Sequence, residues 1–153
     1  RRRRTPAAPG RRRQGGRGDV RGPAGLSYRP MDRLFVALGA FSALLGVALG
    51  AFAAHALRGR LEPDMLATFE VGVRYHVYHA LALLAVGWAA SRWPSGAITA
   101  AGWLFVAGTL LFSGSLYLLS ASGIRWLGAV TPVGGLCFLL GWLLLAWGAW
   151  SAT

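Results

Sequence analysis

The sequence predicts an all-α integral membrane protein built as a four-helix bundle, and three observations support this fold class. Hydrophobic residues make up 55% of the 153-residue chain, whereas only 14% of the residues are charged. The apolar residues form four long runs, and a helix of about 20 residues crosses the ~30 Å hydrocarbon core of a bilayer. Nearly all charges lie in residues 1–33 and 58–74. We therefore expect membrane spans at residues 34–57, 73–91, 97–120 and 130–150.

Residues 1–30 form an N-terminal segment that consists mainly of arginine, glycine, proline and alanine. Such a composition buries too little apolar surface to fold, so we expect a disordered tail ahead of a membrane domain at residues 31–153. A basic tail can bind anionic lipid or nucleic acid. We favour a start-site artefact or a dispensable extension, because Met31 stands just before the first apolar run. No nucleic-acid partner is expected, because the tail lacks interleaved aromatic residues that would stack on bases.

The first expected span, Leu34–Leu57, carries small residues at helical spacing. Gly39, Gly46 and Gly50 form a stripe on which another helix can pack closely. Asp32 stands just ahead of the span as a predicted N-cap. A cleaved signal peptide is the alternative, but the apolar run is longer than the ~7–15 residues typical of such peptides.

The second expected span follows an amphipathic extension. Pro63 suits the first position of a helix and Asp64 complements the helix dipole, and we expect this helix to continue to Ala90. Its first turns carry apolar residues on one side, as an interfacial amphipathic helix does: Met65, Leu66, Phe69 and Val73. We expect the helix to enter the membrane near Tyr75.

The last two spans are rich in small and hydroxyl-bearing residues. Ser113, Gly114 and Ser115 are grouped in the third span, where we expect close helix packing. Thr131 and Pro132 read as the N-cap and first position of the fourth helix. Further packing glycines lie seven apart in that helix: Gly134, Gly141 and Gly148. The single Cys137 excludes a disulfide framework within the chain and a cysteine metal site.

Four spans bring the ionisable side chains at membrane depth to one end of the bundle. The candidate functional cluster at this end comprises His55, Glu70, Arg74, Tyr75, His76, His79, Ser113, Ser115, Tyr117 and Thr131. The opposite half offers Ser42, Thr99 and tryptophans, and no ionisable group is expected there. Ionisable groups are costly inside a membrane, so such a cluster is a functional-site hypothesis.

Helix spacing limits what this cluster can do. Glu70 and Arg74 are four apart in the order that favours an ion pair. His76 and His79 are three apart and could share a ligand, with His55 reaching them from the first helix. We favour interhelical hydrogen bonds or interface anchoring for the histidines, with a proton relay and a metal site as open alternatives. Glu70 and His79 are nine residues apart and therefore lie on roughly opposite sides of the helix, so one metal cannot easily bind both. We predict no metal or cofactor.

The sequence contains no nucleophile–base arrangement, no phosphate-binding loop and no paired carboxylates, so we do not expect an enzyme. Two functions stay open. The first is a non-catalytic structural or accessory membrane protein, whose partners are the lipid bilayer and either further copies of the chain or a membrane complex. The second is a small oligomeric transporter or proton-linked channel that uses the cluster near His55 and His79.

Four stretches resemble a known family of small four-span membrane proteins: residues 50–57, 69–84, 112–119 and 129–142. The family is catalogued as domain of unknown function 423 and as uncharacterised protein family 382, and it includes bacterial inner-membrane proteins and the transmembrane protein 256 group. The resemblance covers about residues 31–150. Its pattern carries onto His55, Tyr75, His79, Ser113, Gly114, Ser115, Tyr117, Thr131, Pro132, Gly134 and Gly135. His76 departs from the pattern, since the family usually has glutamine there.

The resemblance implies a fold and a location but no reaction. We expect a multi-pass protein of the plasma membrane, the bacterial inner membrane. An even number of spans puts both termini on one side. Eleven of the sixteen basic residues lie at or before Arg33, so the positive-inside rule predicts cytoplasmic termini. Without the tail the arginine count on the two sides is nearly balanced.

Overall fold

The computed structural model describes residues 30–152, and every regular element in this range is helical. The α-helices are α1 (Pro30–Phe52), α2 (Pro63–Arg92), α3 (Gly96–Gly108), α4 (Gly114–Ser122) and α5 (Thr131–Trp150). Two π-helical turns, η1 (Ala53–Leu57) and η2 (Thr109–Ser113), and one 3-10 helix, η3 (Arg125–Ala129), complete the described elements. The predicted all-α class is confirmed. The predicted N-terminal tail lies outside the described residues.

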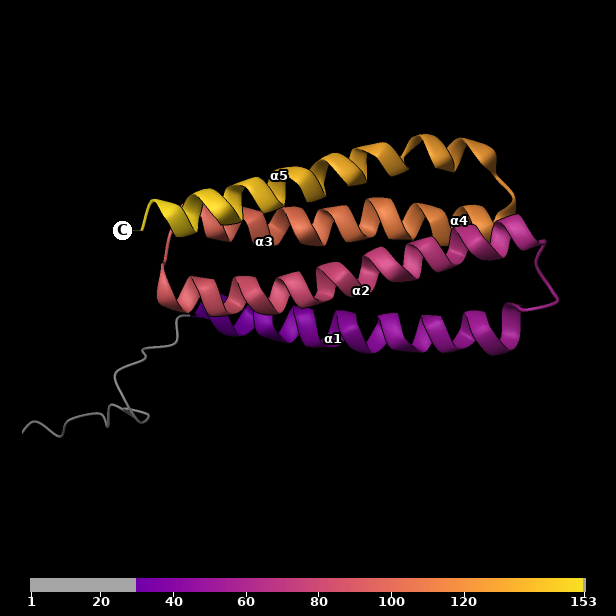
Figure 1. Ribbon diagram of the computed structural model, residues 1–153, viewed down its shortest axis with the longest axis horizontal. Helices are drawn as coiled ribbons and strands as arrows, with labels where there is room; N and C mark the ends of the chain where they lie inside the picture. The colour runs from indigo at the N-terminus through magenta and orange to yellow at the C-terminus, as the bar shows by residue number, and fades with distance from the viewer. Residues whose placement is uncertain (1–29, 153) are drawn as a thin grey trace, which may run out of the picture.

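The helices form four rods, because α3, η2 and α4 follow one another without a break (Figure 1). The rods lie side by side, and each runs antiparallel to the one before it in sequence. In the view of Figure 1 the order from bottom to top is α1, α2, α3 with α4, and α5. The start of α1 and the end of α5 lie at the same end of the bundle.

Three rods in the described part of the chain are long and apolar enough to cross a membrane: Pro30–Leu57, Gly96–Ser122 and Arg125–Trp150. The fourth rod, α2, has 30 residues, about 45 Å at 1.5 Å per residue, so its length is sufficient. It is less apolar, because polar side chains such as Arg74, His76 and His79 interrupt its sequence.

The glycine stripe of α1 faces α2. A Cβ atom at Gly39 would lie 2.8 Å from Leu84 Cδ2, and one at Gly46 would lie 2.7 Å from Val77 Cγ2. Gly50 is less crowded, with Val73 Cγ1 3.3 Å from its would-be Cβ. Small residues therefore let the two backbones approach, as in other membrane helix pairs.

Phenylalanine rings fill the space that glycine leaves between the other rods. Phe105 on α3 occupies the position where Gly141 on α5 has no Cβ atom, and Phe138 on α5 does the same at Gly108 on α3. Gly134 lies against the backbone of Phe112, and Gly148 lies against Ile98. This reciprocal arrangement joins α3 and α5 over most of their length. Gly114, in contrast, has no neighbour within 4 Å of a Cβ atom, so the packing role predicted for it is wrong.

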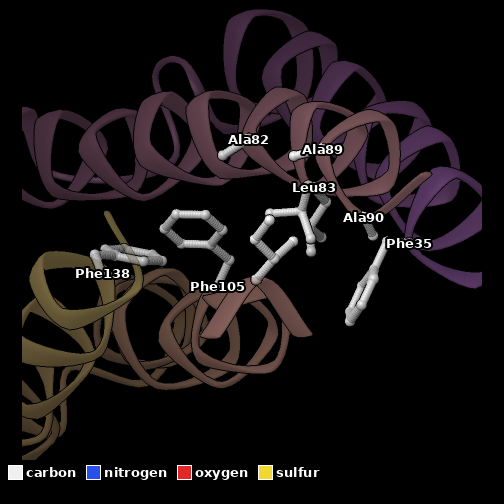
Figure 2. Close-up of a cluster of buried hydrophobic side chains, with 9 residues drawn as sticks. Phe35, Ala82, Leu83, Ala89, Ala90, Phe105 and Phe138 are labelled. Atoms are coloured by element: carbon white, nitrogen blue, oxygen red, sulfur yellow. The ribbon is translucent and has the colours of Figure 1, made fainter. Parts of the chain in front are cut away.

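The buried core lies between the rods and is small. Figure 2 shows Phe35, Leu83, Phe105 and Phe138 in this core, from α1, α2, α3 and α5. The outward surface carries many large apolar side chains, among them Leu44 at 64% exposed, Leu110 at 70% and Trp147 at 65%. Soluble monomers rarely expose such a continuous apolar surface. A lipid environment accounts for it.

Two local predictions are wrong. Asp32 is not an N-cap, because α1 begins at Pro30 and Asp32 lies in its first turn. Thr131 does not cap α5 either, since it is the first residue of that helix and the preceding Val130 makes no side-chain cap. The single helix predicted to begin at Pro63 and to continue to Ala90 is confirmed, since α2 runs from Pro63 to Arg92. Its first turns pack on α4, where the Phe69 and Tyr117 rings are 4.7 Å apart.

Candidate functional site

His76 links three rods through its two ring nitrogens. The side chain is buried on α2, with Nδ1 3.2 Å from the Tyr117 hydroxyl on α4 and Nε2 2.9 Å from the Ser42 hydroxyl on α1. Glycines make the approach possible. A Cβ atom at Gly72 would lie 2.8 Å from the Tyr117 ring, and Gly46 lies beside the His76 ring. Both partners are hydroxyls, which can donate or accept, so either tautomer of His76 can be satisfied.

His79, one turn further along α2, links α2 to α5. Its ring stacks on Phe138, with the centroids 3.4 Å apart and the planes 4° from parallel. Nδ1 lies 2.8 Å from the carbonyl oxygen of Tyr75, and the Trp142 indole N–H donates to Nε2 over 3.3 Å. A carbonyl can only accept and an indole N–H can only donate. These neighbours therefore select the neutral His79 tautomer that carries its proton on Nδ1.

The two histidines do not share a ligand, although the sequence allowed it. Their hydrogen bonds go to different rods, His76 to α1 and α4 and His79 to α5. Among residues 30–152 no group of three histidine, cysteine, aspartate or glutamate side chains could hold a metal ion.

His55 does not reach the α2 histidines, so this part of the predicted cluster is wrong. It lies exposed in η1. Gly46 lies beside Val77 and Gly50 beside Val73, and this antiparallel register places His55 level with Thr68. His79 is eleven residues further along α2, about 16 Å at 1.5 Å per residue.

The predicted ion pair between Glu70 and Arg74 is not formed. Both side chains are exposed on α2, and no ion pair joins them within the described part of the chain. Tyr75, the next residue, and Tyr78, one turn deeper, are also exposed. This part of α2 therefore carries an arginine without an ion-pair partner among residues 30–152 and two exposed tyrosine rings.

The hydroxyl groups of the third rod have divergent roles. The Ser115 hydroxyl lies 2.8 Å from that of Thr131, which joins α4 to α5. Ser113 lies in the π-helical turn η2, and its hydroxyl is buried with no hydrogen-bond partner among the described residues. An unpaired buried hydroxyl is unfavourable by about 1–3 kcal/mol. π-helical turns often occur at functional sites.

Several residues of the site were absent from the predicted cluster. Ser42 was assigned to the opposite half of the bundle, yet it bonds to His76. Phe138 and Trp142 surround His79, and neither was among the predicted site residues. The available sequence signal was their spacing of four residues, which places both on one face of the same helix. The opposite half is also not free of ionisable groups, because Asp32 is buried there, 2% exposed, beside Pro94 and Ser95.

A groove of about 780 Å³ runs between α2 and α5 on the outer side of His79. Its lining is mostly apolar and aromatic: Tyr75, Tyr78, His79, Phe112, Pro132, Gly135, Leu136, Phe138, Leu139 and Trp142. A smaller cleft of about 220 Å³ lies on the other flank of α2, where Ser42 and His76 form part of its wall.

Taken together, the helical rods, their apolar exterior and the buried histidine contacts define a helical membrane protein. The chain belongs to the family described as "Protein of unknown function (DUF423)", whose family model matches residues 49–135. It is similar to the UPF0382 membrane protein YwdK of Bacillus subtilis (strain 168), with 48% identity over 114 residues, covering 74% of this chain and 93% of the relative.

Staphylococcal relatives give the same result. The UPF0382 membrane protein SSP2132 of Staphylococcus saprophyticus is 42% identical over 119 residues, which cover 78% of this chain and 98% of the relative. The UPF0382 membrane protein SAB0533 of Staphylococcus aureus (strain bovine RF122 / ET3-1) is 44% identical over 113 residues, covering 74% and 92% of the two chains. No solved structure matches the chain. The predicted family and membrane location are therefore confirmed.

Proposed function

We propose that this protein is a non-catalytic membrane protein that acts as a structural or accessory component, through contacts with lipid or with other membrane proteins. One observation carries the proposal. All four ring nitrogens of His76 and His79 are engaged by protein groups on neighbouring rods or on the same helix. Such bonds hold membrane helices in register. They leave neither imidazole free to act as a general base or a metal ligand.

We further propose that all four rods span the plasma membrane, with both termini in the cytoplasm. Although α2 is the least apolar rod, it runs the length of the bundle beside α1 and α4 (Figure 1). Its histidines are buried, His76 against α1 and α4 and His79 against α5, so lipid need not solvate them. Eleven of the sixteen basic residues lie at or before Arg33, which favours the cytoplasmic side for the termini.

The test combines stability and transport measurements on the full chain. In detergent, His79→Ala should lower the melting temperature, whereas His55→Ala should not. In proteoliposomes the wild-type protein should give no flux of protons or alkali cations above that of empty vesicles, at any pH from about 5 to 8. This pH range is chosen because a free histidine side chain gains or loses its proton within it.

A small proton-linked transporter is the second candidate, and one observation favours it. Ser42, His76 and Tyr117 form a hydrogen-bonded chain across three rods, and such chains can pass protons. A pH-dependent flux that disappears in His76→Ala, with folding retained, would replace the first proposal by this one.

A further inference from the structure

The groove between α2 and α5 has the size and lining of a binding site. Its volume of about 780 Å³ lies within the range of small-molecule pockets. Five aromatic side chains and His79 form most of its wall, and the exposed Leu136 and Leu139 mark its outer edge. Because the outward surface of the rods faces lipid, the groove opens sideways to the acyl chains.

The length of the groove matches one leaflet of a bilayer. Its lining on α5 begins at Pro132, in the first turn, and ends at Trp142. This distance is about 15 Å at 1.5 Å per residue, half of the ~30 Å hydrocarbon core. A lipid chain that starts at the water boundary would therefore fill the groove and end near the bilayer centre.

The water-facing end of the groove carries a cation and two hydroxyl donors. Arg74 lies four residues before Tyr78 and thus on the same face of α2. It is exposed and forms no ion pair with any described residue, Glu70 included. The hydroxyls of Tyr75 and Tyr78, which line the groove, have no hydrogen-bond partner among residues 30–152. Glu70 lies a further turn toward the α1–α2 loop, away from the groove.

We propose that this groove binds one acyl chain of an anionic phospholipid, whose phosphate is held by Arg74 and the adjacent tyrosine hydroxyls. A guanidinium binds phosphate through charge-assisted hydrogen bonds. A headgroup without net charge attracts this cation less strongly than an anionic one. Phosphatidylglycerol should therefore be preferred to phosphatidylcholine with the same chains. The site does not depend on whether the protein is accessory or transporting.

Native mass spectrometry of the full chain with equimolar phosphatidylglycerol and phosphatidylcholine tests the proposal. The wild-type protein should retain one phosphatidylglycerol molecule in preference. Arg74→Gln should lower this retention about tenfold, as expected for loss of a charged hydrogen-bond partner. Arg58→Gln, which removes an arginine at the same end but outside the groove, should have no effect.

A second pair of variants tests the groove itself. Gly135 lines the groove, and a Cβ atom there would lie 3.9 Å from Phe112, an ordinary contact. Gly135→Leu should therefore fold and block lipid retention, whereas Gly114→Leu, at a position with open space outside the groove, should not. If Gly135→Leu lowers folding, Leu139→Trp on the exposed edge serves the same purpose.

Three results would overturn the assignment. The first is equal retention of the two lipids by the wild-type protein. The second is unchanged lipid retention in both Gly135→Leu and Leu139→Trp. The third is a dimer in which a second copy of the chain fills the groove in place of lipid.

Discussion

The two buried histidines of α2 differ in the protonation states that their hydrogen-bond partners allow. His76 lies between two hydroxyls that can each donate or accept, so the site tolerates either neutral tautomer and the charged form. His79 lies between a carbonyl and an indole N–H, so only the neutral form with the proton on Nδ1 satisfies both neighbours. Two histidines one turn apart thus form one adaptable contact and one fixed contact. Burial alone therefore does not define a histidine's chemistry, because the polarity of its partners decides it.

The largest expected effect is that of His76→Ala. This change leaves the Ser42 and Tyr117 hydroxyls without their partner and opens a cavity between three rods. We expect the free energy of unfolding to fall by about 2–4 kcal/mol, combining lost packing with two lost interhelical bonds. Equilibrium unfolding in mixed detergent micelles measures it. A loss no larger than that of His79→Ala would contradict the assignment of His76 as the principal link.

His79→Ala should have the next largest effect. It removes the stack on Phe138 and one bond to Trp142, but the site borders an open groove, so the neighbours can relax. We expect about 1–3 kcal/mol of destabilisation. The same unfolding assay applies, and near-ultraviolet circular dichroism should show a change in the Trp142 environment. An unchanged spectrum would indicate that the indole does not contact His79.

The two single hydrogen bonds can be compared by conservative substitutions. Tyr117→Phe and Trp142→Phe each remove one bond to a histidine and keep an aromatic ring. Interhelical hydrogen bonds in membranes contribute about 0.6 kcal/mol on average and up to about 1.7 kcal/mol. Both variants should lie in this range. Double-mutant cycles with His76→Ala and His79→Ala should give coupling energies of this size only within the pairs Tyr117–His76 and Trp142–His79.

The smallest expected effect is that of His55→Ala. The side chain is exposed in η1, and its level on the bundle axis is about 16 Å from that of His79, so the melting temperature should stay at the wild-type value. A clear fall in melting temperature would mean that His55 contacts α2 after all.

The sequence predicts the rods well because apolar run length and glycine spacing are local signals. The four runs became four rods, and Gly39, Gly46 and Gly50 lie against α2 as their spacing indicated. The register between rods is not local. Depth measured from the ends of the apolar runs set His55 level with His79 and Ser42 far from His76. In the structure, the first turns of α2 pack within the bundle and lengthen the α1–α2 hairpin.

The sequence also could not predict which rod each histidine side chain would contact. Residues three apart on a helix are neighbours, yet the His76 and His79 side chains bond to different rods because α2 lies between α1 on one flank and α5 on the other. The glycines that admit the Tyr117 and Phe138 rings, Gly72 and Gly108, gave no signal by themselves. Their partners lie 45 and 30 residues away in the chain, and only the packing of the rods brings them together.

The most direct test of the contrast between the two sites is ¹⁵N nuclear magnetic resonance of histidine side chains in the membrane-reconstituted protein, with His76→Gln and His79→Gln for assignment. Near neutral pH we expect His79 to give the signals of a single neutral tautomer protonated on Nδ1. This tautomer should persist in Trp142→Phe, because the Tyr75 carbonyl still accepts a hydrogen bond from Nδ1. A His79 signal from the tautomer protonated on Nε2 in the wild-type protein would contradict this assignment.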